Sequence, residues 1–312
     1  MAPINTSKVV FLGLGLISGS LALALKRAGW LGRISAWGPR APSLERGLAL
    51  GVIDDYDLDL SRAVAGADVL IIGAPPISTG ELLADLPSRL RALGETPIVT
   101  DLASMKGWVI DQMAESYPRF VPGHPIAGSE NSGVAAARAD LFEGREAILT
   151  PDAGTDLEAL NWVTAMWESV GSRVTIMSAA DHDAALAASS HSPHMLAYAL
   201  TMALADDGLN PMRHGGGALR DMTRIAASDP VMWRDVALTN KKSLIHALTA
   251  VEDQLSVLKE LIAGGEGEQL ERYFSICRSI RRDHDAVLNP FKISTGEQLP
   301  ESDQTDKGRD AE

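Results

Sequence analysis

The sequence predicts a doubly wound α/β domain with a mostly parallel sheet, followed by an all-helical domain. Two observations carry this prediction. In the first half of the chain, short apolar runs alternate with helical patterns, which is typical of βαβ units. From about Ser178 to Leu288 the sequence contains no convincing strand pattern. We therefore expect one domain in residues 1–178, a helical domain in residues 179–292 and a tail in residues 293–312.

Each element has its own signal. Short apolar or β-branched runs predict strands at residues 8–12, 33–37, 68–72, 97–101, 119–123, 147–150 and 173–177. Helical periodicity predicts helices at residues 16–27, 43–50, 81–93, 179–205 (interrupted by Pro193), 244–262 and 268–287. In the helix 244–262 the apolar residues form one stripe, as in a buried helix: Leu248, Val251, Leu255 and Leu258. Residues 295–312 are polar and charged, which predicts disorder.

Composition argues against several kinds of protein. The 312 residues carry a formal charge of −13, which disfavours nucleic acid and anionic membranes as partners. The single cysteine, Cys277, cannot form an internal disulfide or a cysteine-rich zinc site, and this fits a cytoplasmic protein. The sequence lacks a membrane-spanning apolar run and the basic region of a signal peptide. If the ligand is an anion, the few arginines must be concentrated at its site.

The first strand is followed by a glycine turn that opens a helix, which indicates a dinucleotide site of the Rossmann type. Gly13 allows the tight turn, and Gly15 lets the backbone approach a pyrophosphate at the helix N-terminus. Ser18 stands at the third glycine position and is small enough for helix–strand packing. The alternative is an ordinary strand-to-helix turn. The remaining residues that we assign to the cofactor site in this region are Leu16, Ile17, Ala74 and Pro75.

The end of the second strand indicates which cofactor is bound. An acid usually stands there and binds the ribose 2′-hydroxyl of NAD, but the sequence has Trp37, Gly38, Pro39 and Arg40 instead. Arg40 can pair with a 2′-phosphate, which favours NADP, with NAD possible. The alternative is that Arg40 is a surface loop residue.

Three further segments contain candidate catalytic and binding residues. The first is DLASMKG at 101–107, and the second is GHPIAGSENSG from 123, continuing to DLFEG from 140. The third is SHSPH at 190–194, followed by DMTRIAASDPVMWRD from 221. The first two follow strands, where doubly wound sheets bind their ligands. Together with GLGLISGSLA, these motifs closely resemble the prephenate/arogenate (cyclohexadienyl) dehydrogenase family over residues 8–290. This sequence departs from the family pattern at Ser18, Ala103 and Arg220.

The resemblance implies an oxidative decarboxylation in tyrosine biosynthesis. Prephenate would become 4-hydroxyphenylpyruvate, or arogenate would become tyrosine, with hydride transfer from ring carbon C4 to NAD(P). His124 would accept the C4 hydroxyl proton, as an imidazole can near neutral pH. Ser104 would hydrogen-bond the same hydroxyl and the nicotinamide ribose or amide; the alternative is that it caps a helix, and the two roles are compatible. Glu130 resembles the family residue that gates the site; otherwise it is a solvated loop acid.

The second domain supplies the residues that would bind the substrate's carboxylates. Arg224 offers a planar fork for a carboxylate, and Arg220 lies four residues earlier on the same helical face. We assign His194 to substrate binding. His191 and Ser190 either contact the side chain of the substrate or support the residues that do so. A metal site at the two histidines is a weak rival because no carboxylate ligand is assured, so we expect no metal.

Other functions would require different residues. A non-catalytic NAD(P)-binding sensor would not need an imidazole, a hydroxyl and paired arginines. A 3-hydroxyacid type of dehydrogenase would use a catalytic lysine, and Lys106 is the residue that could serve. The two long helices after residue 244 have more apolar surface than one small domain can bury, and the resemblance implies dimerisation. We therefore expect a homodimer, with an interface built mainly from residues 179–290.

Overall fold

The structure is a computed structural model that describes residues 7–113, 115–128, 131–205, 208 and 211–288. The chain divides into two compact units, residues 1–250 and 251–312. The first unit contains the sheets and the first helices of the helical region. The second unit contains the end of one long helix and the helices that follow it.

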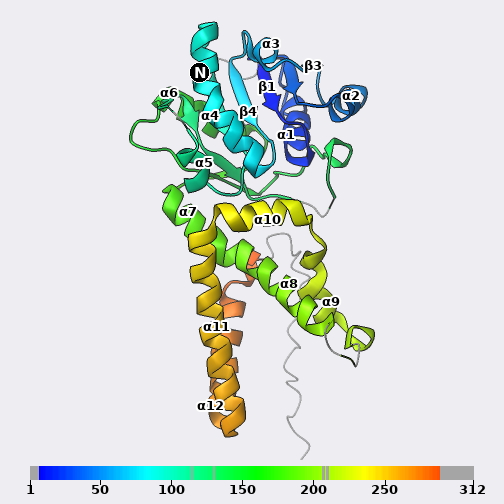
Figure 1. The fold of residues 1–312 in the computed structure, drawn as a ribbon, viewed down its shortest axis with the longest axis vertical. Coiled ribbons are helices and arrows are strands. Elements are labelled where there is room, and N and C mark those ends of the chain that lie inside the picture. Colours follow the sequence, from blue (N-terminus) through cyan, green and yellow to red (C-terminus); the bar gives the residue numbers. More distant parts are fainter. Residues whose placement is uncertain (1–6, 114, 129–130, 206–207, 209–210, 289–312) are drawn as a thin grey trace, which may run out of the picture. The chain divides into compact units, whose positions relative to one another are not determined.

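A six-stranded parallel sheet forms the centre of the first unit, in the order β3-β2-β1-β4-β5-β6 (Figure 1). The strands are β1 (Val9–Leu12), β2 (Ile34–Trp37), β3 (Asp55–Asp57), β4 (Val69–Ile72), β5 (Ile98–Asp101) and β6 (Phe120–Val121). The predicted doubly wound sheet is therefore confirmed. Strand β3 was not expected from the sequence, because its residues, Asp-Tyr-Asp, have no apolar run.

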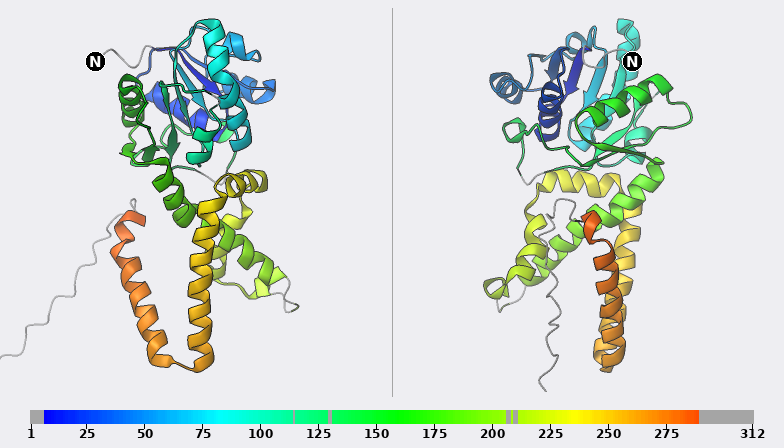
Figure 2. Two further views of the ribbon diagram at one scale, coloured as in Figure 1. Left: turned by 60° about the vertical axis from the view of Figure 1, so that its left-hand side comes forward. Right: turned by 180° about the vertical axis from the view of Figure 1, so that it is seen from behind.

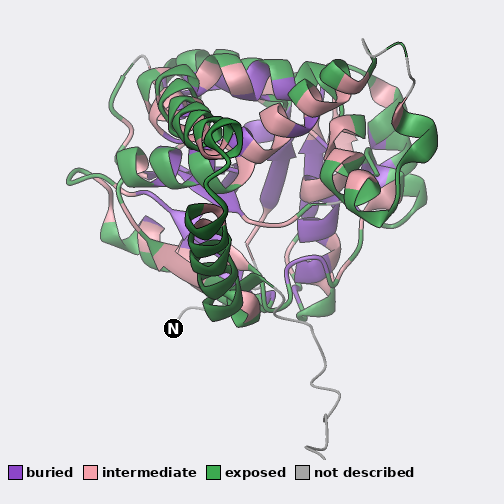
Figure 3. Ribbon diagram, turned by 90° about the horizontal axis from the view of Figure 1, so that it is seen from below, coloured by how far each residue is buried: buried purple, intermediate pink, exposed green. Residues whose placement is uncertain are grey.

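Helices cover both faces of this sheet (Figure 2). In β1, Val9 and Phe11 pack in a cluster with α1 (Leu16–Arg27) and α6 (Leu157–Ser169). The alternate residues, Val10 and Leu12, pack in a cluster with α3 (Leu60–Val64) and α4 (Pro76–Leu93) on the other face. The inner strands β1, β4 and β5 are accordingly buried (Figure 3). Helix α2 (Ala41–Ala49) follows β2.

The predicted strand at 119–123 proves to be two strands in different sheets. Pro122, which has no N–H for a strand ladder, separates β6 from β7 (Gly123–Pro125). Strand β7 pairs antiparallel with β8 (Glu146–Leu149), and β8 pairs parallel with β9 (Arg173–Ile176). The last two predicted strands therefore lie in a second, three-stranded sheet. The break at Pro122 turns the chain so that His124 lies in this second sheet.

The helical part of the first unit begins with α7 (Ala179–Leu186), a π-helical turn (Ala187–His191) and α8 (Ser192–Ala205). This matches the helix predicted at 179–205, with its irregular turn directly before Pro193. Helices α9 (Gly217–Thr223) and α10 (Pro230–Thr239) follow, and Trp233 of α10 packs in the same cluster as α4. Helix α11 (Lys241–Gly264) starts in this unit.

The second unit contains the end of α11, α12 (Gly267–Asp283) and α13 (Asp285–Leu288). The Tyr273 hydroxyl of α12 donates a hydrogen bond to Gln254 Oε1 of α11 at 3.0 Å. The apolar stripe of α11 is not buried as expected: Leu255 is exposed in the single chain, and Leu248, Val251 and Leu258 are partly exposed. The predicted disordered tail, residues 293–312, lies outside the described residues. Among the helices in the described part of the chain, none is both long and apolar enough to cross a membrane.

Candidate active site

The loops after β1 and β4 meet at the edge of the sheet where its strand order reverses, which is where such sheets bind ligands. Gly13 has φ +99°, and a Cβ atom there would lie 2.9 Å from the backbone nitrogen of Ala74. Only glycine permits this backbone conformation and this approach. The structure thus brings the glycine turn and the loop with Ala74 and Pro75 together, as predicted.

The start of α1 has the features of a pyrophosphate cradle. Gly15 is its N-cap and has no side chain that could cap the helix. The amides of Leu16, Ile17 and their neighbours in the first turn therefore receive no side-chain hydrogen bond from the N-cap residue. A Cβ atom on Gly15 would meet nothing within 4 Å, so open space lies before the helix N-terminus. Ser18 is buried, and a Cβ atom on Gly73 would lie 1.9 Å from its hydroxyl oxygen. Ser18 therefore packs between the turn and β4.

Arg40 lies at the same edge of the sheet. In the register of β1 and β2, Trp37 pairs with Leu12, the residue before the glycine turn. Arg40 follows three residues later, exposed, as the N-cap of α2. On the other side of β2, Trp37 pairs with Asp57 of β3. The Asp57 carboxylate binds the guanidinium of Arg62 through Oδ1 at 2.8 Å and through Oδ2 at 2.9 Å. The guanidinium of Arg62 holds the pKa of Asp57 below its usual value.

At the end of β5, a buried ion pair joins Asp101 to Lys106. Both side chains are fully buried, and buried charges persist only when they are paired and hydrogen-bonded. Asp101 also accepts hydrogen bonds from the amides of Ala103 at 3.0 Å and Gly123 at 3.1 Å. Lys106 Nζ donates to the carbonyl oxygen of Gly123 at 2.6 Å. The pair thus connects the DLASMKG loop to the residue before His124.

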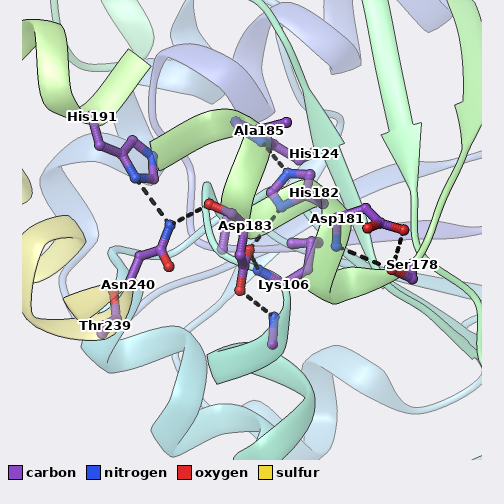
Figure 4. Close-up of polar contacts among 12 residues, drawn as sticks. Lys106, His124, Ser178, Asp181, His182, Asp183, Ala185, His191, Thr239 and Asn240 are labelled. Carbon is purple, nitrogen blue, oxygen red and sulfur yellow. Dashed lines mark hydrogen bonds and ion pairs between the residues drawn. The ribbon is translucent and has the colours of Figure 1, made fainter. Parts of the chain in front are cut away.

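His124 is almost buried and contacts a second histidine. Its Nδ1 atom lies 2.9 Å from Nε2 of His182, on α7. His182 Nδ1 lies 2.8 Å from Oδ1 of Asp183 (Figure 4). Burial lowers the pKa of His124 well below its usual value, and the nearby His182, Lys106 and His191 lower it further. His124 is therefore a neutral imidazole at pH 7.

Asp183 also caps the helix that follows the DLASMKG loop, α5 (Gly107–Asp111). Its Oδ1 accepts from the amide of Lys106 at 2.8 Å, and its Oδ2 accepts from that of Gly107 at 2.9 Å. Burial acts to raise the pKa of Asp183, but the hydrogen bonds from His182 and from these amides outweigh it and lower the pKa. Asp183 is therefore an ionised carboxylate.

The SHSPH segment presents two histidines with different partners. His191 is buried, and its Nδ1 accepts a hydrogen bond from Asn240 Nδ2 at 3.2 Å (Figure 4). Burial lowers the pKa of His191 to about 4. His194 is partly exposed and stacks on Trp233, with ring centroids 3.6 Å apart, and its Nδ1 donates to the carbonyl oxygen of Ser190 at 2.9 Å. Burial, aided by the charge of Arg224, lowers the pKa of His194.

Comparisons with known proteins decide the family. Residues 21–176 match the family model described as prephenate dehydrogenase, nucleotide-binding domain, and residues 178–276 match prephenate dehydrogenase, dimerization domain. The chain belongs to the prephenate dehydrogenase family. The family is one of oxidoreductases, and the resemblance stated from the motifs is confirmed.

Relatives resemble the chain over nearly its whole length. A cyclohexadienyl dehydrogenase of Zymomonas mobilis is 34% identical, over 89% of this chain and 97% of its own. A prephenate dehydrogenase of Bacillus subtilis is also 34% identical, over 88% of this chain and 75% of its own. The crystal structure of prephenate dehydrogenase from Aquifex aeolicus, in complex with hydroxyphenyl propionate and NAD+, superimposes with a TM-score of 0.84. It is 34% identical and covers 90% of this chain and 99% of that chain.

The predicted site residues differ in their exposure and in their partners. Ser104 lies in the loop between β5 and α5, partly exposed; α5 is capped by Asp183, so Ser104 is not its N-cap. Arg224 follows the end of α9 and is exposed. Arg220 is exposed and forms a surface salt bridge with its neighbour Asp221, at 3.1 Å. Glu130 lies outside the described residues.

The burial of His191 favours one of its two predicted roles. Its side chain packs edge-on against Trp233, with ring centroids 6.0 Å apart, and has almost no contact with solvent. This position fits the supporting role better than direct contact with a substrate. Ser190 contributes its carbonyl oxygen to His194. Within the described residues, no group of three or more potential metal ligands is suitably arranged.

Sequence reasoning missed the residues behind His124. His182, Asp183 and Asn240 were not singled out, and Lys106 was considered only as a rival catalytic lysine. Its full burial against Asp101 removes that role. A signal for the first two was present: Asp181-His182-Asp183 places carboxylates on both sides of a histidine in the first turn of the helical region.

Proposed function

We propose that this protein catalyses the oxidative decarboxylation of prephenate, with hydride transfer to NAD(P)+. The observation that carries the proposal is the position of His124: a neutral, nearly buried imidazole that follows directly after Gly123, which is bound to the end of β5. A general base must be unprotonated at the working pH. The family membership and the complex of the Aquifex aeolicus relative with NAD+ and hydroxyphenyl propionate support the same conclusion.

The residues at the first turn fit a dinucleotide. The open space at Gly15 and the uncapped amides of α1 suit a pyrophosphate, which a helix N-terminus attracts. Leu16 and Ile17 would contribute backbone amides there, and Ala74 and Pro75 would form the opposite wall. When bound, NAD(P)+ supplies the acceptor for the hydride that leaves C4 of the substrate.

In this proposal the protein's own residues handle the proton and the charges. His124 accepts the C4 hydroxyl proton at Nε2, since Nδ1 already contacts His182. Ser104, partly exposed in the loop before α5, hydrogen-bonds the same hydroxyl. As the hydride leaves C4, the bond from the ring to its carboxylate breaks, CO2 departs and the ring becomes aromatic.

Arg224 binds a carboxylate of the substrate, and His194 contacts the substrate beside it. An exposed guanidinium offers a bidentate fork, and its charge is felt by the His194 ring. The stack on Trp233 and the hydrogen bond to Ser190 hold that ring in place. Arg220 lies four residues before Arg224 and adds a second guanidinium there, paired with Asp221.

Arogenate is the alternative substrate at the same site. It differs from prephenate only in carrying an amino group where prephenate has a keto group. For the cofactor, we propose NADP over NAD, because Arg40 is exposed beside the glycine turn and Asp57 is occupied by Arg62.

We also propose that residues 1–178 form the cofactor domain and that the protein is a homodimer through residues 179–292. The family model matched by residues 178–276 is described as a dimerization domain. Large apolar side chains on α11 to α13 are exposed in the single chain: Leu255, Val257, Ile262, Phe274, Ile276, Ile280, Val287 and Leu288. Such a surface is typical of a covered interface.

Initial rates with prephenate and arogenate, each with NAD+ and NADP+, test the function directly. We expect NAD(P)H to appear with at least one substrate. A protein that binds NAD(P)H tightly but reduces neither cofactor with either substrate would instead be a non-catalytic sensor.

A further inference from the structure

A chain of three side chains leads away from His124 into the protein. His124 on β7 contacts His182 on α7, and His182 contacts the carboxylate of Asp183 (Figure 4). His182 is completely buried, and Asp183 is only 8% exposed. Neither side chain is positioned to contact a substrate, so the proposed chemistry at His124 leaves both without a role.

The direction of the hydrogen bonds follows from the ionised end of this chain. The Asp183 carboxylate already accepts from the amides of Lys106 and Gly107, and a carboxylate can only accept. His182 must therefore donate from Nδ1. In the tautomer of His182 with its only proton on Nδ1, Nε2 presents a lone pair, to which His124 donates from Nδ1. This leaves the lone pair of His124 at Nε2.

Asp183 also fixes the position of the Ser104 loop relative to this pair of histidines. The amides that it binds belong to residues two and three positions after Ser104. Its main-chain carbonyl oxygen accepts a hydrogen bond from Asn240 Nδ2 at 2.9 Å, so α7 is anchored from the α10–α11 junction as well. One carboxylate thus holds both the loop with the hydroxyl and the imidazole behind the base.

We propose that His182 and Asp183 are positioning residues that hold His124 in the tautomer protonated on Nδ1, so that Nε2 is the base. This proposal rests on the proposed function of His124. When Nε2 takes up the C4 hydroxyl proton, the imidazolium of His124 keeps its Nδ1–H bond to His182. The Asp183 carboxylate behind them compensates the new positive charge. An orienting carboxylate has the same effect on the base of a serine protease, where the wrong tautomer lowers kcat about 10⁴-fold.

Two variants at position 182 separate this role from simple packing. In His182→Gln, the amide oxygen can accept from His124 and the amide nitrogen can donate to Asp183. In His182→Leu, the space is filled but neither bond forms. We expect kcat to fall on the order of 10²-fold in the leucine variant with KM much less affected, and the glutamine variant to recover most of that loss. A packing role would reverse this order, since leucine is the better core residue.

The tautomer itself can be measured without substrate. Nitrogen-15 spectra of the full-length protein labelled at histidine distinguish a protonated from an unprotonated ring nitrogen, and the His124 signals are those lost in His124→Asn. We expect wild-type His124 to carry its proton on Nδ1 and to lose this preference in His182→Leu. A wild-type His124 protonated on Nε2, beside a cationic His182, would overturn the proposal. So would a leucine variant with unchanged kcat and tautomer.

This experiment separates the two proposals. If the wild-type protein reduces neither cofactor with prephenate or arogenate, the proposed function fails while the tautomer is still measured. If turnover is present but the tautomer is the opposite one, only the positioning role fails.

Discussion

The Lys106 ammonium donates a hydrogen bond to the carbonyl oxygen of Gly123, 2.6 Å away, while it pairs with the carboxylate of Asp101. Asp101 in turn accepts from the amide of the same glycine. Both backbone groups of Gly123 are therefore bound to one buried ion pair. Because His124 is the next residue, this pair fixes where the strand that carries this histidine begins.

We predict that Lys106→Met lowers the free energy of unfolding by about 3–5 kcal/mol, because it leaves the Asp101 carboxylate buried without its partner. Urea denaturation followed by circular dichroism measures this change. The control is Arg138→Met, which breaks the exposed pair with Asp140 and is expected to change stability little. Equal effects of the two substitutions would show that the buried pair contributes no more to the free energy of unfolding than the exposed pair.

His124→Asn is expected to fold normally and to lose 10²–10⁴-fold in kcat, roughly the contribution of a general base. Asparagine keeps a polar side chain of similar size but cannot take up a proton. Steady-state rates of NAD(P)H formation measure the loss. The matched control is His246→Asn, at an exposed position on α11, and it should retain wild-type rates. Near-wild-type turnover in the first variant would remove His124 from the mechanism.

The pH dependence should report the neutral state of His124. Burial first, and then Coulombic contributions from His182, Lys106 and His191, lower the pKa of this imidazole below 6.5. The base is active when unprotonated, so activity is lost only as the pH falls through this lowered pKa. We therefore expect the acidic limb of the kcat/KM profile to lie below pH 6.5. An acidic limb above pH 6.5 would mean that His124 has the pKa of a solvated histidine or is not the base.

The sequence predicted the elements whose signal is local. Strands β1 and β4 are buried on both faces, so each appears as a continuous apolar run. Edge strand β3 has no such run, and it forms because Asp55 to Asp57 pair with β2. Pro122 is visible in the sequence, but no local pattern shows that the residues after it leave the first sheet and pair with β8.

The same distinction applies to the site. His124 and Ser104 were found because each stands in a motif that follows a predicted strand and resembles a motif of the family. The partner of His124 comes from α7, which is 58 residues away in the chain, and no local pattern specifies that contact. Likewise, the capping of α5 by Asp183 spans 77 residues, so a serine in the preceding loop was the natural local candidate for a cap.

Cofactor choice should depend on the end of β2. Arg40→Ala is expected to raise the KM for NADP+ about tenfold and to leave that for NAD+ nearly unchanged, because one charge-assisted contact to the 2′-phosphate is lost. The control is Arg33→Ala, at the opposite end of the same strand, where the arginine pairs with Asp55. Equal effects of Arg40→Ala on both cofactors, or none on either, would make Arg40 a surface residue.

Gly38→Asp tests the same site from the opposite direction. A Cβ atom at Gly38 would make only ordinary contacts, 3.7 Å from Leu44, so the backbone can accept the change. The new carboxylate would bind the ribose hydroxyls of NAD+ and repel a 2′-phosphate. The ratio of kcat/KM for NAD+ to that for NADP+ should therefore rise, and an unchanged ratio would place the adenosine ribose elsewhere.

The exposed apolar residues of α12 should be covered in a homodimer. Ile276 and Ile280 are each 56% exposed and lie four residues apart, on one face of the helix. A chain of 33.2 kDa should therefore scatter light as a particle of twice that mass, with roughly 2,000 Å² or more of total buried interface. The double substitution of Ile276 and Ile280 by glutamate should give monomers at micromolar concentration. Arg278→Glu, which changes the net charge by the same two units on the same helix, is the control and should remain dimeric. Because association stabilises the folded chain, dilution to monomers should lower activity and thermal stability together. A wild-type monomer with full activity would contradict this assembly.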